Sequence, residues 1–150
     1  VSDRFHARLN AKTKTYIYRV WNSEQPCVFD RKFVHVDPRS MDITAMQEAA
    51  THFLGEHDFT AFCANKKMKK STVRTIYSFE VDEYENEIRF TVSGSGFLQH
   101  MVRIMVGTLC EIGAGKRDIE SIPYLLEVRE REEAGITMPS KGLTLMEIEY

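Results

Sequence analysis

The sequence predicts an α+β domain in which a largely antiparallel sheet is covered on one face by helices, close to a ferredoxin-like arrangement. Three observations predict this fold class. Several segments alternate apolar and polar residues, which is typical of half-buried strands. Other, longer segments carry apolar residues at helical spacing. Taken along the chain, the order is strand, helix, strand, strand, helix, helix, strand.

The first half of the chain is predicted to hold one long strand and one helix. Residues 11–21 contain the alternating run Lys-Thr-Lys-Thr-Tyr-Ile-Tyr-Arg-Val, which is rich in β-branched and aromatic side chains. A proline-containing connection follows over 22–41, with a short extended piece at 33–36. Apolar residues at helical spacing predict a helix over 42–55, ending at a glycine. Residues 63–71 form a polar, lysine-rich loop.

The second half is predicted to hold a hairpin, two helices and a final strand. Glu85 and Asn86 form the turn between two alternating runs, and Asp118 caps the second helix. The ranges are 73–84 and 87–93 for the hairpin, 98–112 and 119–128 for the helices, 129–142 for a charged loop and 143–150 for the last strand.

Bulk composition indicates one globular domain. The chain has 150 residues, of which 43% are hydrophobic and 28% charged, and this is enough for a sizeable core. Its three cysteines form no Cys-x-x-Cys pair, so free thiols in a reducing cytoplasm are expected. No apolar run is long enough to span a membrane, and no signal peptide is expected.

Charge is unevenly distributed, although the net charge is only −2. Residues 1–20 and 63–75 are strongly basic, whereas residues 80–87 hold five acidic side chains and no basic one. This pattern predicts one face for a polyanion and another for solvent.

One arginine stands inside an otherwise apolar helical run. Arg103 lies in Gly-Ser-Gly-Phe-Leu-Gln-His-Met-Val-Arg-Ile, which begins at Gly94 and contains no acidic residue. Burying an unpaired guanidinium is costly. Arg103 therefore either reaches water along the helix surface or meets a carboxylate from another segment or domain.

The same run resembles the signature helix of the tRNA pseudouridine synthase A family, in its Gly-Phe-Leu-x-His-Met-Val-Arg and Val-Gly-Thr-Leu elements. Further matching stretches occur in the family's order and cover essentially the whole chain; they are Phe5-His6-Ala7-Arg8 leading to Tyr16-Ile17-Tyr18-Arg19, Phe59-Thr60-Ala61-Phe62, Arg74-Thr75-Ile76 and Gly142-Leu143-Thr144-Leu145. Gln99 stands at a position where an aromatic residue is common in the family. The family's catalytic aspartate motif, Arg-Thr-Asp-Ala-Gly-Val-His, does not occur here, so the chain resembles the C-terminal domain over residues 1–150.

The resemblance implies isomerisation of uridine to pseudouridine in the tRNA anticodon stem-loop. It places Tyr16 and Arg103 in the catalytic site, Arg103 pairing with the aspartate and Tyr16 stacking on the uracil. It places Leu143 on the other side of the base. From the residues alone, the simpler interpretation of Tyr16 and Leu143 is that they are ordinary core residues of strands. The resemblance further implies no cofactor or metal, a cytoplasmic homodimer, and an inactive fragment when the aspartate is missing.

Two stretches are the candidate RNA contacts, because lysine and arginine neutralise phosphates. They are Phe5, His6, Ala7, Arg8 and Leu9, and the loop lysines Lys66, Lys67, Lys69 and Lys70. A solvated loop explains the lysine run equally well. His52 and His57 are five residues apart, a poor spacing for metal ligands on a helix, and no metal site is predicted.

Two readings without catalysis remain open. The chain can be a stand-alone RNA-binding module, because an antiparallel sheet with aromatic residues and basic loops suits RNA recognition. It can also be a dimerisation domain that uses an apolar sheet edge or helix face.

Overall fold

A single mixed sheet forms the base of the molecule. In the computed structural model, which describes residues 12–28, 30–67 and 70–149, six strands belong to it. They are β1 (Thr13–Trp21), β2 (His35–Val36), β3 (Gly55–Asp58), β4 (Val73–Glu83), β5 (Glu87–Gly94) and β6 (Leu143–Glu149). The order is β2-β1-β5-β4-β3, and β6 pairs with β1 beside β2. All pairings are antiparallel except that of β1 with β2.

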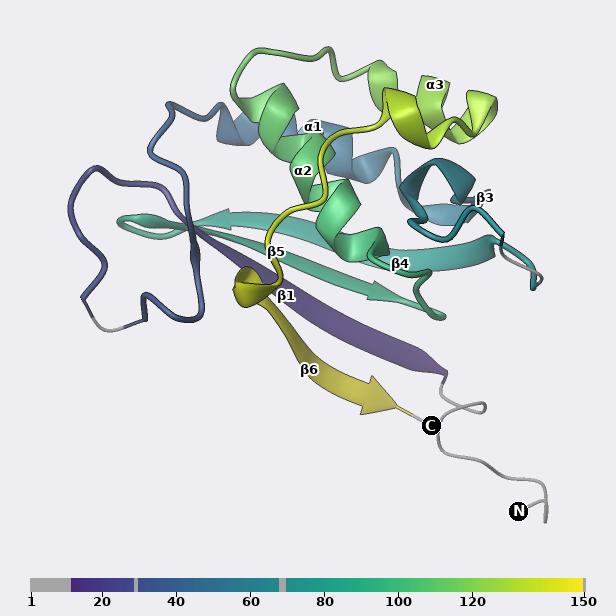
Figure 1. Cartoon of the computed structure of the whole chain (residues 1–150), viewed down its shortest axis with the longest axis horizontal. Helices are drawn as coiled ribbons and strands as arrows, with labels where there is room; N and C mark the ends of the chain where they lie inside the picture. The colour runs from purple at the N-terminus through teal and green to yellow at the C-terminus, as the bar shows by residue number, and fades with distance from the viewer. Residues whose placement is uncertain (1–11, 29, 68–69, 150) are drawn as a thin grey trace.

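Three helices in the described part of the chain lie on one side of this sheet (Figure 1). They are α1 (Ile43–Thr51), α2 (Met101–Gly113) and α3 (Ser121–Val128), and short 3₁₀ turns occur at Thr60–Phe62, Arg131–Glu133 and Ser140–Gly142. This arrangement confirms the predicted α+β class with a largely antiparallel sheet and helices on one face.

The alternation in β1 and β5 separates the two faces of the sheet. Tyr18, Val20, Phe90 and Val92 are fully buried beneath the helices, because side chains two residues apart point the same way. α2 lies at the centre of the core, and eleven of its thirteen residues are buried. A helix that is apolar on nearly all sides must be covered on nearly all sides. The remaining two residues, Arg103 and Glu111, are partly exposed.

The opposite face of the sheet carries a charged cluster. Arg19 donates from Nε and Nη2 to the two carboxylate oxygens of Glu87, at 2.9 and 2.7 Å. Arg89 also donates from Nε to Glu87, which is only 7% exposed. Burial alone would raise the pKa of Glu87, but the hydrogen bonds from both arginines outweigh it and lower that pKa. Glu87 is therefore an ionised anchor between β1 and β5.

The structure differs from the predicted elements at three places. β3 was not predicted, because its Gly-Glu-His-Asp sequence is polar and only backbone pairing with β4 makes it a strand. Gly55 begins this strand, so the preceding helix ends four residues earlier, at Thr51.

The other two differences concern helix starts. α2 begins at Met101 rather than at residue 98. His100 has a left-handed backbone conformation (φ 60°), which does not fit a right-handed helix, so the helix starts only after this residue. Phe97 consequently precedes the helix. α3 begins at Ser121, two residues after the predicted start, and Asp118 contributes its backbone carbonyl rather than a side-chain cap.

Candidate active site

The residues predicted for catalysis and base binding line one cavity. Tyr16 from β1, Arg103 from α2 and Leu143 from β6 surround a hollow of about 170 Å³. Its remaining lining residues are Phe97, Leu98, His100, Met101, Val102 and Ser140. No acidic side chain of the described residues is among them. The volume is below the roughly 300–1,000 Å³ of sites for drug-sized ligands, so the cavity suits a group as small as one ring.

Tyr16 forms an aromatic wall of the cavity. Its ring packs edge-on against Phe97, with ring centroids 5.2 Å apart and an interplanar angle of 90°. Tyr18 lies on the same face of β1 but is fully buried, and its hydroxyl donates to the Pro139 carbonyl at 2.5 Å. Burial raises the pKa of Tyr18. Of the two tyrosines, therefore, Tyr16 presents its side chain to the cavity, whereas Tyr18 packs in the hydrophobic core.

Arg103 is held by one backbone group. Its Nε donates to the Met138 carbonyl at 2.6 Å, and the Met138 amide donates to the Arg103 carbonyl at 3.2 Å. In the part of the chain that the structure describes, Arg103 forms no salt bridge and its two terminal nitrogens have no hydrogen bond. The guanidinium is thus fixed on one side and open on the other.

Leu143 reaches the cavity because of the glycine before it. Leu143 is the first residue of β6 and pairs with Tyr18 on β1. A Cβ on Gly142 would lie 2.7 Å from Tyr18 Cζ and 2.8 Å from the Arg19 carbonyl oxygen, closer than real side chains approach. Only glycine lets the chain enter β6 directly against Tyr18, and Leu143, the next residue, lines the cavity.

Six lining residues were given no role in the site from the sequence. Five of them, residues 97, 98, 100, 101 and 102, belong to the matched Gly-Phe-Leu-x-His-Met-Val-Arg element, whereas Ser140 belongs to no matched motif. His100 is exposed and adopts φ 60° and ψ 12°, a left-handed conformation that is uncommon outside glycine. Such backbone strain is found at functional sites. The Gly-Ser-Gly loop before it indicated an unusual entry to the helix, but a single sequence does not reveal which residue takes the strained position.

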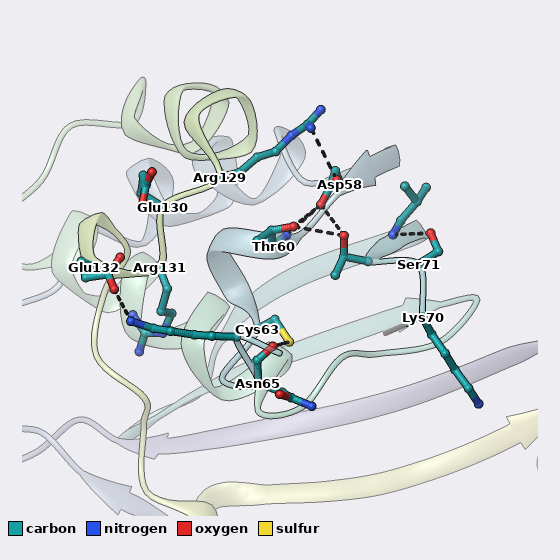
Figure 2. Close-up of a pocket in the computed structure, with 13 residues that line it drawn as sticks. Asp58, Thr60, Cys63, Asn65, Lys70, Ser71, Arg129, Glu130, Arg131 and Glu132 are labelled. Carbon is teal, nitrogen blue, oxygen red and sulfur yellow. Dashed lines mark hydrogen bonds and ion pairs between the residues drawn. The ribbon is translucent and has the colours of Figure 1, made fainter. Parts of the chain in front are cut away.

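The predicted RNA contacts are described only in part. Phe5, His6, Ala7, Arg8 and Leu9 lie outside the described residues, and so does Lys69. Lys66 forms an ion pair with Glu132, and Lys70 points away from the other labelled side chains of a second cavity, of about 470 Å³ (Figure 2). Three carboxylates line that cavity together with four basic side chains, so its charge is mixed.

The lysine loop lies close to the first cavity. The Ala64 amide donates to the Gln99 carbonyl at 3.0 Å, and Gln99 directly precedes His100. Residues 64–67 thus begin beside the N-terminal end of α2, next to the lining residue His100. Lys66 and Lys67 follow within three residues of this contact.

The family model for "tRNA pseudouridine synthase" matches residues 49–150, more than half of the chain. The chain belongs to the tRNA pseudouridine synthase family. It is 46% identical over its full length to "tRNA pseudouridine synthase A 2" of a Bacillus cereus strain, and also to that of Bacillus anthracis. It is 45% identical to "tRNA pseudouridine synthase A 1" of Bacillus cereus (strain ATCC 14579), over 99% of the chain. The chain spans about three-fifths of these relatives: 61% of the first two and 60% of the third. The observed sheet and helices fit the pseudouridine synthase fold.

Two observations on the described residues concern membrane spanning and metal binding. No helix there has the length and apolar character needed to cross a membrane. No three histidine, cysteine or acidic side chains of residues 12–28, 30–67 and 70–149 are grouped so that they could hold a metal ion.

Proposed function

We propose that this chain is the C-terminal part of a synthase that isomerises uridine to pseudouridine in the anticodon stem-loop of tRNA. The observation that carries the proposal is the cavity shared by Tyr16, Arg103 and Leu143, in a chain that belongs to this family. The three residues come from β1, α2 and β6, which are far apart in the sequence.

The reaction requires an apolar slot for a base taken out of its stack. Pseudouridine formation detaches uracil from ribose, rotates it and rejoins it through carbon, with loss of the proton on that carbon. Enzymes that act on a base hold the extruded ring between aromatic and apolar side chains. Tyr16 and Leu143 supply such surfaces, and the cavity has room for a single ring. The Tyr16 hydroxyl is the candidate group for moving the carbon-bound proton.

Arg103 is proposed to bind the nucleophilic carboxylate. A guanidinium has five N–H donors, and Met138 engages the one on Nε. The terminal nitrogens are then available for the two oxygens of one carboxylate, in the bidentate geometry that arginine favours. An adjacent arginine lowers the pKa of a carboxyl group and keeps it ionised, as a nucleophile requires. We propose that a segment outside this chain supplies this aspartate, so residues 1–150 alone are inactive.

The tRNA is proposed to bind across the mouth of this cavity. Lys66, Lys67 and Lys70 supply positive charge for phosphates, together with Lys69 and residues 5–9, which lie outside the described residues. Leu145 and Met146 on β6 are 44% and 56% exposed, which leaves apolar surface for the rest of the protein or a second subunit. A cytoplasmic homodimer that works without a cofactor or metal completes the proposal, and the resemblance to the family supports it.

A tritium-release assay tests the proposal. The complete protein is incubated with unmodified tRNA that carries tritium at uracil C5, because that hydrogen is lost when the base rejoins through carbon. The wild type and a control, Arg31→Ala on an exposed loop residue, are expected to release tritium. Arg103→Ala is expected to lose at least about 100-fold in rate while still retaining tRNA on a filter.

The outcomes separate the candidate functions. Retention of tRNA without any release by the wild type would favour the RNA-binding module, and self-association without tRNA binding would favour the dimerisation domain. Equal rates for Arg103→Ala and Arg31→Ala would remove Arg103 from the catalytic site.

A further inference from the structure

A segment of irregular backbone runs along α2 and ends at Arg103. Residues 134–139, here called the strap, connect the Arg131–Glu133 turn to the Ser140–Gly142 turn, and the segment passes over α2 in Figure 1. Gly135 contacts the middle of α2 and Met138 contacts its first turn, so the two run in opposite directions. The strap covers the stripe of α2 that contains Arg103, Gly107 and Glu111.

Backbone packs directly on backbone at this crossing. A Cβ on Gly107 would lie 2.0 Å from the Ile136 carbonyl oxygen, and one on Gly135 would lie 2.6 Å from the Thr108 amide nitrogen. Real Cβ atoms essentially never come within 3.0 Å of other heavy atoms. Glycine at both positions is therefore required for the observed distance between helix and strap.

Hydrogen bonds fix the register of the strap on the helix. The Gly135 amide donates to Thr108 Oγ1 at 2.9 Å, and the same hydroxyl donates to the Ile104 carbonyl at 2.9 Å. The Ile136 amide donates to Glu111 Oε2 at 3.2 Å. A shift of the strap along α2 would break these contacts together.

The register determines where the Met138 carbonyl lies, and this carbonyl holds Nε of Arg103 at 2.6 Å. The Met138 amide binds the Arg103 backbone in return, and Met138 is 2% exposed. One guanidinium edge is thereby fixed by buried backbone rather than by a flexible side chain. The strap then continues through Ser140, which lines the cavity, to Leu143.

We propose that the strap is the positioning device for Arg103, and that Gly107 and Thr108 are its positioning residues. Neither residue lines the cavity, so each acts through the Met138 carbonyl. The inference rests on the proposed role of Arg103 toward a carboxylate. A strap in the wrong register would let the guanidinium turn, and the nucleophile would lose its fixed partner.

Kinetics of the complete protein test this inference with two pairs of variants. One pair compares two substitutions of Thr108, and the other compares alanine at two glycines of α2. Thr108→Val removes the acceptor for Gly135, whereas Thr108→Ser keeps the hydroxyl. Gly107→Ala pushes on the strap backbone, whereas a Cβ at Gly113 on the same helix meets side-chain atoms of two flexible methionines, Met46 and Met41, and no strap atom. Thr108→Val and Gly107→Ala are expected to lower kcat, the latter by about 100-fold, with KM for tRNA unchanged. Thr108→Ser and Gly113→Ala are expected to keep kcat.

The pH profile separates positioning from mere loss of folded protein. A loosened Arg103 no longer depresses the pKa of the nucleophilic carboxyl group, so the acid limb of kcat is expected to move up by about half a unit or more in Thr108→Val. A change in folded fraction alone leaves that limb in place. The ¹H–¹⁵N resonance of Arg103 Nε, identified by its loss in Arg103→Lys, is expected to exchange faster with water in the same variant.

Three results would overturn the inference. The first is an acid limb of kcat in Thr108→Val that lies at the wild-type pH, and the second is an unchanged Arg103 Nε resonance in that variant. The third is failure of both Thr108→Val and Gly107→Ala to fold, which would give the strap a role in stability only. An inactive wild type would instead contradict the proposed function, and the Nε resonance would still report whether the strap holds Arg103.

Discussion

Two tyrosines on one strand are predicted to respond oppositely to loss of their hydroxyl group. Tyr16 and Tyr18 lie on the same face of β1, but Tyr16 lines the cavity and Tyr18 is fully buried. The Tyr18 hydroxyl donates to the Pro139 carbonyl at 2.5 Å, whereas no hydrogen bond of the Tyr16 hydroxyl occurs within the described residues. Tyr16→Phe is expected to reduce turnover and Tyr18→Phe to reduce stability.

The magnitudes follow from these contacts. Tyr18→Phe leaves the Pro139 carbonyl without its donor in a partly buried hydrogen bond, which costs about 0.5–1.5 kcal/mol of the free energy of unfolding. For a protein of this size each kcal/mol lowers Tm by roughly 2–4 °C. Tyr16→Phe removes no such contact, so its free energy of unfolding is expected to stay within about 0.5 kcal/mol of the wild type. Loss of a group that transfers a proton lowers kcat by about 10²–10⁴-fold.

Thermal melts and tritium release on the complete protein give both quantities, with Tyr77→Phe as the control because Tyr77 is 55% exposed on β4. Tyr18→Phe acts on the strap through Pro139, so a loss of kcat smaller than that of Tyr16→Phe is expected. The reasoning is refuted if Tyr16→Phe melts several degrees lower with normal turnover, or if Tyr18→Phe melts like the control.

Three further predictions concern other parts of the molecule. Glu87→Gln is expected to cost about 3 kcal/mol at pH 7, because it removes the buried carboxylate that Arg19 and Arg89 share and leaves Arg19 only its contact with the exposed Asp30. The pKa of Glu87 is lower in the folded state than in the unfolded state. The stabilisation by Glu87 is therefore fully present above the unfolded-state pKa and is lost as the pH falls through the folded-state pKa. Wild-type stability measured by urea unfolding should therefore fall in acid more steeply than that of Glu87→Gln, and parallel curves would exclude this anchor. His100→Gly is expected to raise the free energy of unfolding by up to about 1 kcal/mol by relieving the left-handed backbone, whereas His100→Ala is not; a lower Tm for the glycine variant would contradict the assigned strain. Alanine at Lys66, Lys67 and Lys70 together is expected to weaken tRNA binding and to reduce the slope of log Kd against log salt by about two to three, and an unchanged slope would remove this loop from the RNA surface.

The fold was predictable where the pattern of side chains decides the structure. The hairpin of β4 and β5, the long strand β1 and the central helix all follow from apolar periodicity, because each buries one face or nearly all of its surface. Periodicity gave no signal for β3, whose pairing uses backbone groups of polar residues. The start of α2 was missed because His100 takes a conformation that sequence propensity assigns to glycine.

The grouping of Tyr16, Arg103 and Leu143 was expected from motifs, and the structure places all three around one cavity. The partner that holds Arg103 was not predictable. It is the backbone carbonyl of Met138, thirty-five residues away, and a backbone group leaves no trace in residue types. From the sequence, Gly107 was only one residue of the matched Val-Gly-Thr-Leu element. In the structure it is the residue of α2 on which the strap backbone packs.

The most direct measurement is a crystal structure of the complete protein, in which the distance from the Arg103 terminal nitrogens to the nearest carboxylate is read. The account predicts an aspartate from outside residues 1–150 within about 4 Å, facing the hollow between Tyr16 and Leu143. A guanidinium that points into solvent, or a carboxylate on the far side of α2, would contradict it.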